Sequence, residues 1–406
     1  KYISDQKRID SDNEVEGAVL FINGSARQGG GDRSRTSFGL EVLLPVTSKL
    51  ELTTALRSDE YDDESSAVGR RQSAMINFAY RPHDKLLLRG SAGESFRAPD
   101  MHYVYAGSSS YFDSVTDYRD CYAKGVPSYQ SCDNTYTIKG RFEGNKRLDA
   151  ESGENYSLGL VWDYAEGGSF TMDLFQVILE GAVTNVDVAQ IAVREAYCIH
   201  GEDFSDWYNN SDFSGVNCAD TLNAVVRGAP GELDQDGLGD IDEVTTFNQN
   251  QSKEEFQGID TTLRYAWSTE SAGDFSWVLY NSNIISRYRK TDELSDEIDL
   301  LDAYIYEPRS QQTATLSWRY DDWRASWYMD RTGHTEQYYG EKGDPFITHN
   351  LSASYNFSAD LNIRATVSNV FDEMPEKDSA YGWPYFNRSY YSIFGRATYL
   401  AVDYRF

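Results

Sequence analysis

The sequence has no long apolar run and too few basic residues to balance its acidic ones. Mean hydropathy is -0.60 over 406 residues, and no stretch approaches the roughly 18 apolar residues that a membrane-spanning helix needs. Lys and Arg number 37 against 65 Asp and Glu, which gives a net charge of -28 and a pI of about 4.5. A field of this sign repels nucleic acid and argues against a DNA- or RNA-binding role.

Cysteine is scarce, with four in the chain at positions 121, 132, 198 and 218. None forms a C-x-x-C pair, and none lies near a histidine at the spacing typical of a zinc finger. They form two local pairs, each inside a polar stretch, which indicates an oxidising compartment. Three pairings are open to four cysteines, and we favour the nearest-neighbour pairing, Cys121–Cys132 and Cys198–Cys218.

The usual catalytic patterns are also missing. We find no P-loop, no G-x-S-x-G motif and no adjacent nucleophile and base, so enzyme activity is not predicted. The chain starts at Lys1 without an initiator methionine or a signal peptide. For an exported protein, this start suggests a processed or partial chain.

Aromatic residues are abundant, at 14% of the chain, and they follow a strand pattern. In the last segment, Phe394–Phe406, the side chains of Leu400, Val402, Tyr404 and Phe406 fall on one face of an extended strand, and the opposite face carries charge. An outer-membrane barrel places lipid against such an apolar face, a polar lumen inside, and aromatic girdles at both membrane interfaces.

The alternation occurs in thirteen segments, this one included, and the connections between them are alternately short and long. The predicted strands are Ser37–Val46, Leu50–Arg57, Ala74–Tyr80, Lys85–Phe96, Tyr156–Tyr164, Phe170–Val183, Ile259–Trp267, Phe275–Tyr288, Thr313–Tyr320, Trp323–Met329, Leu351–Phe357, Leu361–Val367 and Phe394–Phe406. The long connections lie near 58–70, 98–150, 184–253, 288–308, 333–346 and 372–391, and they read as polar, non-periodic loops. Loops segregated by length predict an all-β fold, a transmembrane antiparallel β-barrel with long extracellular loops. A soluble β-sandwich or propeller is the alternative, although its loops are rarely this long.

An odd number of strands has a consequence for the start of the chain. Bacterial single-chain barrels have an even number, with both ends on the short-turn side. The first predicted strand leads into a short turn, so the chain before it should lie on the long-loop side, and we expect strands upstream of this sequence. Lys1–Arg35 is predicted as a polar loop with a short hairpin around Ala18–Ile22. A strand overlooked in that loop would instead give fourteen and a complete small barrel.

Four segments resemble, in the same order, parts of the TonB-dependent outer-membrane receptors. They are Lys49–Asp62 (KLELTTALRSDEYD), Leu86–Met101 (LLLRGSAGESFRAPDM, with its FRAP turn), Val367–Pro375 (VSNVFDEMP) and the terminal strand ending in Phe406. The resemblance covers roughly Ser37 to the end of the chain. It implies a barrel of about 22 strands filled by an N-terminal plug. This chain would then be the C-terminal barrel portion, about the last thirteen strands, without the plug and the TonB-binding box.

The resemblance implies active import of a scarce, bulky nutrient such as a siderophore, haem, cobalamin, glycan or peptide. It places the protein in the outer membrane of a Gram-negative bacterium. The expected partners are outer-membrane lipid, TonB through the missing N-terminal region, the nutrient ligand, and a surface lipoprotein. The alternatives are a passive porin-like channel and a surface binding protein without transport. Acidic loops favour a neutral glycan, a peptide or a cation complex over an anionic ferric siderophore.

Aromatic residues in the long loops are the candidates for ligand binding. Aromatic faces stack on sugars and cofactor rings, and tyrosine also supplies a hydroxyl. An outer girdle, or packing between loops, is the alternative role for most of them. The candidates are Tyr103, Tyr105, Tyr111, Phe112, Trp207, Tyr208, Tyr338, Tyr339, Trp383 and Tyr385.

The segment DQDGLGDIDE at 234–243 predicts a calcium site in an extracellular loop. Asp234, Asp236, Asp240 and Asp242 place hard oxygen ligands at alternate positions around two glycines, which suits Ca²⁺. The segment is not a complete EF-hand, because Thr245 stands where the final glutamate would be. A solvated acidic turn is the alternative, and no other cofactor is predicted.

Overall fold

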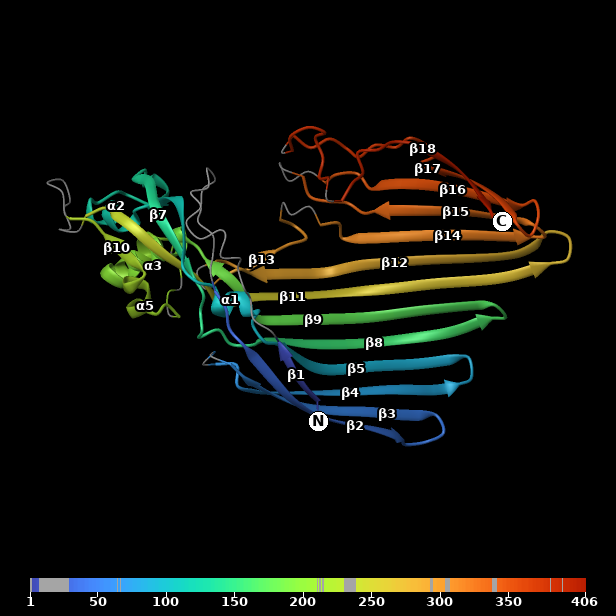
Figure 1. Cartoon of the computed structure of the whole chain (residues 1–406), viewed down its shortest axis with the longest axis horizontal. Coiled ribbons are helices and arrows are strands. Elements are labelled where there is room, and N and C mark those ends of the chain that lie inside the picture. Colours follow the sequence, from blue (N-terminus) through green and yellow to red (C-terminus); the bar gives the residue numbers. More distant parts are fainter. Residues whose placement is uncertain are drawn as a thin grey trace.

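The computed structural model divides into a wall of long strands and a cap at one end of that wall (Figure 1). Apolar and polar residues alternate along the strands of the wall, and this alternation is absent from the cap. The two parts therefore have different sequence patterns. The residues described are 2–6, 29–63, 65, 67–209, 211, 213, 215–229, 239–292, 295–303, 307–337, 342–379, 381–388 and 390–406.

Thirteen consecutive antiparallel strands form the wall, and they are the thirteen that the alternation predicts. In spatial order they are β2 (Arg33–Pro45), β3 (Leu50–Asp62), β4 (Arg70–His83), β5 (Leu86–Arg97), β8 (Glu151–Ala165), β9 (Gly168–Val186), β11 (Ile241–Thr269), β12 (Gly273–Lys290), β14 (Ser310–Tyr320), β15 (Trp323–Thr332), β16 (Phe346–Asn356), β17 (Leu361–Ser368) and β18 (Ala397–Tyr404). Short turns lie at one end and long connections at the other (Figure 1). The wall is an open sheet over the described residues, with no closed barrel.

The prediction for Lys1–Arg35 is wrong in one respect, because this stretch contains a strand. β1 (Tyr2–Gln6) pairs antiparallel with the start of β2, from Tyr2 opposite Ser37 to Gln6 opposite Arg33. The segment carries no regular apolar alternation, and the backbone ladder alone defines the strand. The hairpin expected around Ala18–Ile22 lies outside the described residues.

The register of the wall gathers apolar side chains on one face and polar ones on the other. Leu40 on β2 lies opposite Leu56 on β3. Leu158 on β8 lies opposite Gly90 on β5 and opposite Leu174 on β9. A one-residue slip would reverse the two faces, so the pattern fixes the pairing. Leu158 is 55% exposed in the protein alone, as expected for a side chain whose packing partner is a bilayer.

Aromatic rings cluster where the strands meet the short turns. Trp267 stacks on Phe275 of the next strand at 5.0 Å, and Trp323 contacts Tyr355 at 4.7 Å. These contacts run across neighbouring strands of the wall, as in the aromatic girdle at a membrane interface. Further ring pairs are Trp162–Tyr164, Tyr164–Tyr265, Tyr265–Trp267, Trp318–Tyr320, Tyr355–Phe357 and Tyr404–Phe406.

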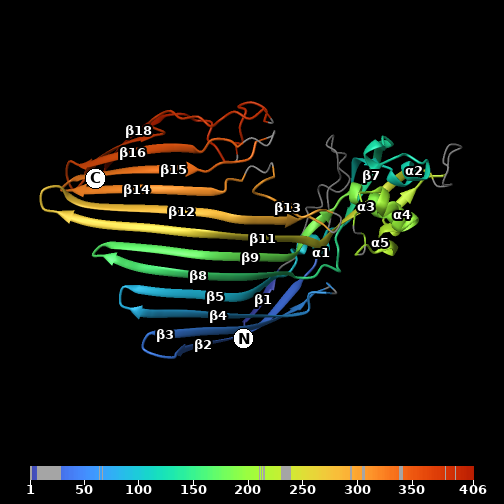
Figure 2. The same ribbon diagram turned by 180° about the vertical axis from the view of Figure 1, so that it is seen from behind.

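The two longest connections do not form irregular loops as predicted, and much of each folds into the cap. Figure 2 shows the cap set apart from the wall beyond its long-loop end, as in Figure 1. α1 (Met101–Tyr105) lies at the junction with the wall (Figure 1). The elements of the cap are β6 (Ser109–Thr116), α2 (Tyr118–Ala123), η2 (Tyr129–Ser131), β7 (Thr135–Glu143), α3 (Val188–His200), α4 (Glu202–Trp207), α5 (Cys218–Asn223), β10 (Val225–Arg227) and the start of β11. A two-residue strand, β13 (Ile298–Asp299), pairs with β12.

One strand, β11, connects the cap to the wall. It begins at Ile241, far before the predicted start at Ile259, and runs for 29 residues. At about 3.3 Å per residue it is roughly 95 Å long, whereas about 9–11 residues cross a bilayer. Its first part pairs with β7 and β10, and its later part with β9 and β12. The cap is therefore continuous with the wall through this ladder.

α3 organises the core of the cap. A capping box starts it, because Asp187 accepts from the backbone N–H of Gln190 while the Gln190 side chain bonds back to Asp187. Its apolar side chains face two clusters, one with Ile191 against β6, β7 and β11, and one with Ala196 against Phe204. None of the helices within the described residues combines the length and the hydropathy needed to cross a bilayer.

Candidate ligand-binding region

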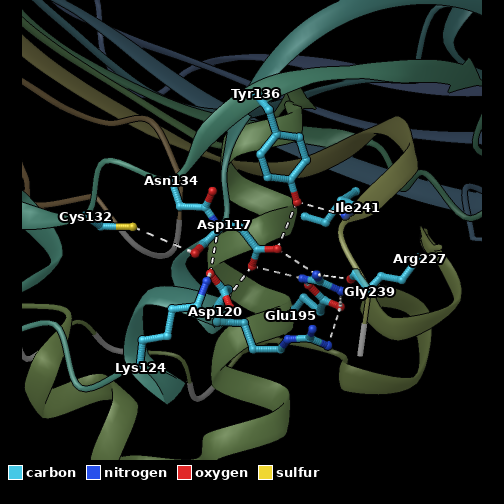
Figure 3. Close-up of polar contacts among 11 residues, drawn as sticks. Asp117, Asp120, Lys124, Cys132, Asn134, Tyr136, Glu195, Arg227, Gly239 and Ile241 are labelled. Carbon is cyan, nitrogen blue, oxygen red and sulfur yellow. Dashed lines mark hydrogen bonds and ion pairs between the residues drawn. The ribbon is translucent and has the colours of Figure 1, made fainter. Parts of the chain in front are cut away.

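A buried ion cluster lies at the centre of the cap (Figure 3). Arg227, at the end of β10, contacts Asp117 before α2 at 2.6 Å and Glu195 on α3 at 2.5 Å. Both carboxylates are nearly inaccessible to solvent, with Asp117 only 1% exposed. The Tyr136 hydroxyl donates to Asp117 at 2.9 Å and accepts from the backbone N–H of Ile241 at 2.8 Å. The cluster therefore joins β10, α2, α3, β7 and β11.

The electrostatics of the cluster favour the charged forms of Asp117 and Arg227. Burial opposes ionisation of Asp117, but the hydrogen bonds and charge of Arg227 outweigh it and hold the pKa of the carboxyl below its usual value. Burial would also lower the pKa of Arg227, yet the bonds to Glu195 and Asp117 raise it above normal. Burial is the main cause that raises the pKa of Tyr136, so its hydroxyl stays a neutral donor. The cluster is enclosed by the protein and has a structural role.

Two disulfides also hold the cap together, and they confirm the predicted pairing of the cysteines. Cys121–Cys132 ties α2 to the residue after η2, and Cys198–Cys218 ties the end of α3 to the start of α5. Each closes a short loop, with sequence separations of 11 and 20 residues. Because both lie in the cap, they restrain the region that the period-two pattern does not define.

Four of the predicted ligand aromatics are buried or partly buried against other residues. Tyr105 is buried beside Leu148, and its hydroxyl contacts the carbonyl of Asp32 at 3.3 Å. Tyr111 and Thr246 share a hydroxyl–hydroxyl bond of 3.0 Å. Trp207 donates to the carbonyl of Val126 at 2.8 Å, and Tyr208 packs in the same aromatic cluster. Burial is the main cause that raises the pKa of Tyr208. All four side chains therefore have a packing role.

Three of the remaining described candidates are exposed and Tyr103 is partly buried, and they do not form one site. Phe112, 63% exposed, belongs to the cap, whereas Trp383, 72% exposed, belongs to the connection before β18. Tyr385 in that connection lies 5.9 Å from the Lys377 ammonium, and Tyr103 packs against the cluster around α1. Tyr338 and Tyr339 lie outside the described residues. Their role in ligand binding stays a prediction.

The predicted calcium loop is described only in part. Asp234 and Asp236 lie outside the described residues. Asp240 is exposed just before β11, and Asp242 faces Gly228. Within the described part of the chain, no group of three or more His, Cys, Asp or Glu side chains could hold a metal. Calcium binding therefore stays a prediction.

A pocket that was not predicted lies where the cap meets the wall. This junction pocket has a volume of about 240 Å³ and lies between β11, α3, α5 and the β7–β8 connection. Arg194 on α3 lines it and is 4% exposed. The Arg194 guanidinium donates to the Gln249 and Gln251 side-chain oxygens at 3.2 and 3.0 Å. The run of amides at 248–251 was the available signal.

A second, larger cavity of about 1170 Å³ lies against the wall near the short turns. Ser276, Ser317, Ser326 and Ser352 form one cross-strand row along it. The next row brings Arg319 opposite Arg324, with Asp274 and Ser354 beside them. Small hydroxyls and charges on this face, opposite the aromatic side chains, make it the polar side of the wall.

The family of the chain follows from a comparison with known protein families. A family model described as "TonB dependent receptor-like, beta-barrel" matches residues 5–370. The chain belongs to this family. The predicted family and barrel fold are both confirmed.

Two curated relatives carry receptor names. The ferric enterobactin receptor of Pseudomonas aeruginosa is 22% identical over 380 residues, which cover 91% of this chain and 42% of that protein. The probable TonB-dependent siderophore receptor PirA of Acinetobacter baumannii is 22% identical over 401 residues, covering 93% and 44%. The chain spans less than half the length of these relatives.

A solved structure has the same fold. The siderophore receptor PirA from Acinetobacter baumannii superposes with a TM-score of 0.60 at 17% identity, covering 93% of this chain and 46% of that one. The chain therefore has the fold of part of that receptor.

Proposed function

We propose that the complete protein imports a ferric siderophore across the outer membrane with energy delivered by TonB. The observation that carries this proposal is the match of the family's barrel to residues 5–370. Relatives named as siderophore receptors move our preference away from the glycan or peptide that the loop charge favours. Both relatives are receptors, which agrees with the prediction that the chain is not an enzyme.

The apolar face of the wall and its aromatic girdle support a place in the outer membrane of a Gram-negative bacterium, with the cap outside the cell. Lipid would then cover the face that holds Leu158, and the serine row would face the lumen. TonB would contact a region outside this chain. A surface lipoprotein remains a further proposed partner of the cap.

The cap would act in ligand capture as a rigid unit. Its ion cluster and disulfides hold the loops in one arrangement before a ligand arrives, which reduces the ordering cost of binding. The connections 98–150 and 184–253 hold 20 Asp and Glu against 9 Lys and Arg. Long-range attraction of an anionic ligand is therefore not expected, and recognition should depend on local contacts.

Uptake by living cells tests this proposal. A strain lacking the gene would be complemented with the full-length protein and supplied with radioactive iron bound to catecholate, hydroxamate or carboxylate siderophores. We expect uptake of one class to require both this protein and TonB. Uptake that persists without TonB would contradict the proposal. Ligand-independent conductance in planar bilayers would then support the passive channel.

A further inference from the structure

Two arginines line the junction pocket, the buried Arg194 and the exposed Arg147. Arg194 is almost fully buried and held by Gln249 and Gln251. At the rim, the Arg147 guanidinium contacts the Asp220 carboxylate at 2.7 Å, and both side chains are substantially exposed. Exposed ion pairs of this kind contribute little to stability, so a competing anion can replace one partner.

Neutral polar groups between these cations are already anchored. The Asn145 side chain donates to the carbonyl of Asn248 at 2.8 Å. The Asn250 side chain donates to the carbonyls of Asp149 and Gly181 at 2.9 and 2.8 Å. Both asparagines line the pocket. Anchored side chains need little reordering on binding, which favours recognition by a preformed site.

We propose that the junction pocket binds a compact hydroxycarboxylate, whose carboxylate replaces that of Asp220 on Arg147. Arg147 already binds a carboxylate in this position, so the guanidinium has the required orientation. The Thr221 hydroxyl and the Gln249 amide in the lining suit hydroxyl groups, and Phe247 supplies a small apolar surface. A volume of 240 Å³ is below the usual range for drug-sized ligands, so an intact siderophore is too large.

The ligand would be either a free small acid or a carboxylate-bearing arm of a larger molecule. The proposal rests on the pocket and not on import of a siderophore. If malate competes with uptake of the transported siderophore, the pocket holds an arm of that ligand. If malate binds without affecting uptake, the pocket serves a separate acid, and both results support the pocket.

Titration calorimetry of the full-length protein in detergent at low salt tests the proposal, with malate as the probe and glycerol as the neutral control. We expect saturable malate binding with a Kd of about 1 mM and no binding of glycerol. Arg147→Gln should weaken malate binding about tenfold or more, because a charged hydrogen bond is lost. Lys146→Gln is the matched control, since it removes the same charge from the adjacent exposed position, and the Kd should stay unchanged.

Asp220→Asn separates the proposal from a purely structural role of the ion pair. The asparagine can keep the bond with Asn217 but no longer competes for Arg147, so malate binding should tighten. Weaker binding by Asp220→Asn would overturn the proposal. Equal losses in Lys146→Gln and Arg147→Gln, or no saturable binding up to about 10 mM malate, would also overturn it. Disulfide mapping confirms that the cap of each variant is folded.

Discussion

The wall and the cap are stabilised in different ways. The wall is one layer of ladders whose apolar side chains face outward, and Leu158 illustrates how little of the protein covers them. The cap buries its apolar side chains around α3, locks Asp117 and Glu195 with Arg227, and carries both disulfides. In the proposed location a membrane would supply the missing layer for the wall, whereas the cap must supply its own core.

Replacing Arg227 should have the largest effect, because it should destabilise the cap and leave the wall unchanged. Arg227→Ala leaves the buried Asp117 carboxylate without its cation, and it leaves Glu195 with Arg119, whose guanidinium lies 3.8 Å away. The cap should therefore lose about 3–5 kcal/mol of stability. Hydrogen exchange across a urea series would show faster exchange in α3 and β10 while the strands of the wall keep their protection.

Arg70→Ala is the matched control for that variant. Arg70 also pairs with a glutamate, Glu60 at 2.8 Å, but both side chains are exposed on the wall. Solvent screens this pair, so its loss should leave exchange in the cap and the wall unchanged. Equal effects of the two variants would show that the buried cluster does not stabilise the cap.

A charge on the lipid face should destabilise the wall without affecting the cap. Leu158→Arg should cost about 2–4 kcal/mol near the middle of the bilayer. Ser157→Arg places the same charge on the opposite face and should cost about 1 kcal/mol, the size of its lost hydrogen bond with Ser91. Unfolding from lipid vesicles measures both, and a larger loss for Ser157→Arg would reverse the assignment of faces.

Removal of a disulfide should loosen the cap alone. The double variant Cys198→Ser and Cys218→Ser should lose about 2–4 kcal/mol in the cap. The corresponding variant at 121 and 132 should lose about 0.5 kcal/mol less, because its loop is shorter. Protease resistance of the cap and exchange of the wall strands provide the two readouts. Loss of protection in the wall would contradict the separation.

Low pH should produce the smallest loss of stability, and this loss should again be confined to the cap. The pKa of Asp117 is lowered in the folded state, so its contribution is present above the ordinary aspartate pKa of about 4 and is lost as pH falls through the folded-state value. Bonds from Lys139 and the charge of Arg141 likewise lower the pKa of Glu243. The urea midpoint of α3 exchange should fall below about pH 4. Asp117→Asn should flatten this dependence, and an unchanged slope would remove Asp117 as its cause.

The same comparison explains how much of the fold could be predicted. All thirteen wall strands follow from period-two alternation, because one face must be apolar along its whole length. Strands that do not need a continuous apolar face were not predicted. The first part of β11, before Ile259, packs through side-chain hydrogen bonds such as those of Gln249 and Asn250, so it carries no apolar alternation.

In the cap, some signals were present and others were not. Asp187 and Gln190 form a readable capping box, and the apolar residues Val188, Ile191 and Ala192 have helical spacing, so α3 could have been recognised. The cysteine pairs were predictable because each is local. The ion cluster was not, since Arg227 and Asp117 are 110 residues apart and only the fold brings them together. The packing of Tyr105 and Trp207 likewise depends on distant partners.

Site-specific labelling of intact cells tests the central claim most directly. The four native cysteines are in disulfides, so a membrane-impermeant maleimide would report on Asp203→Cys in the cap and Asp322→Cys in the turn between β14 and β15, both exposed positions. The account predicts labelling of Asp203→Cys in intact cells, and of Asp322→Cys only after the outer membrane is permeabilised. Labelling of Asp322→Cys alone, or of both positions in intact cells, would contradict a wall that spans the outer membrane with its cap outside.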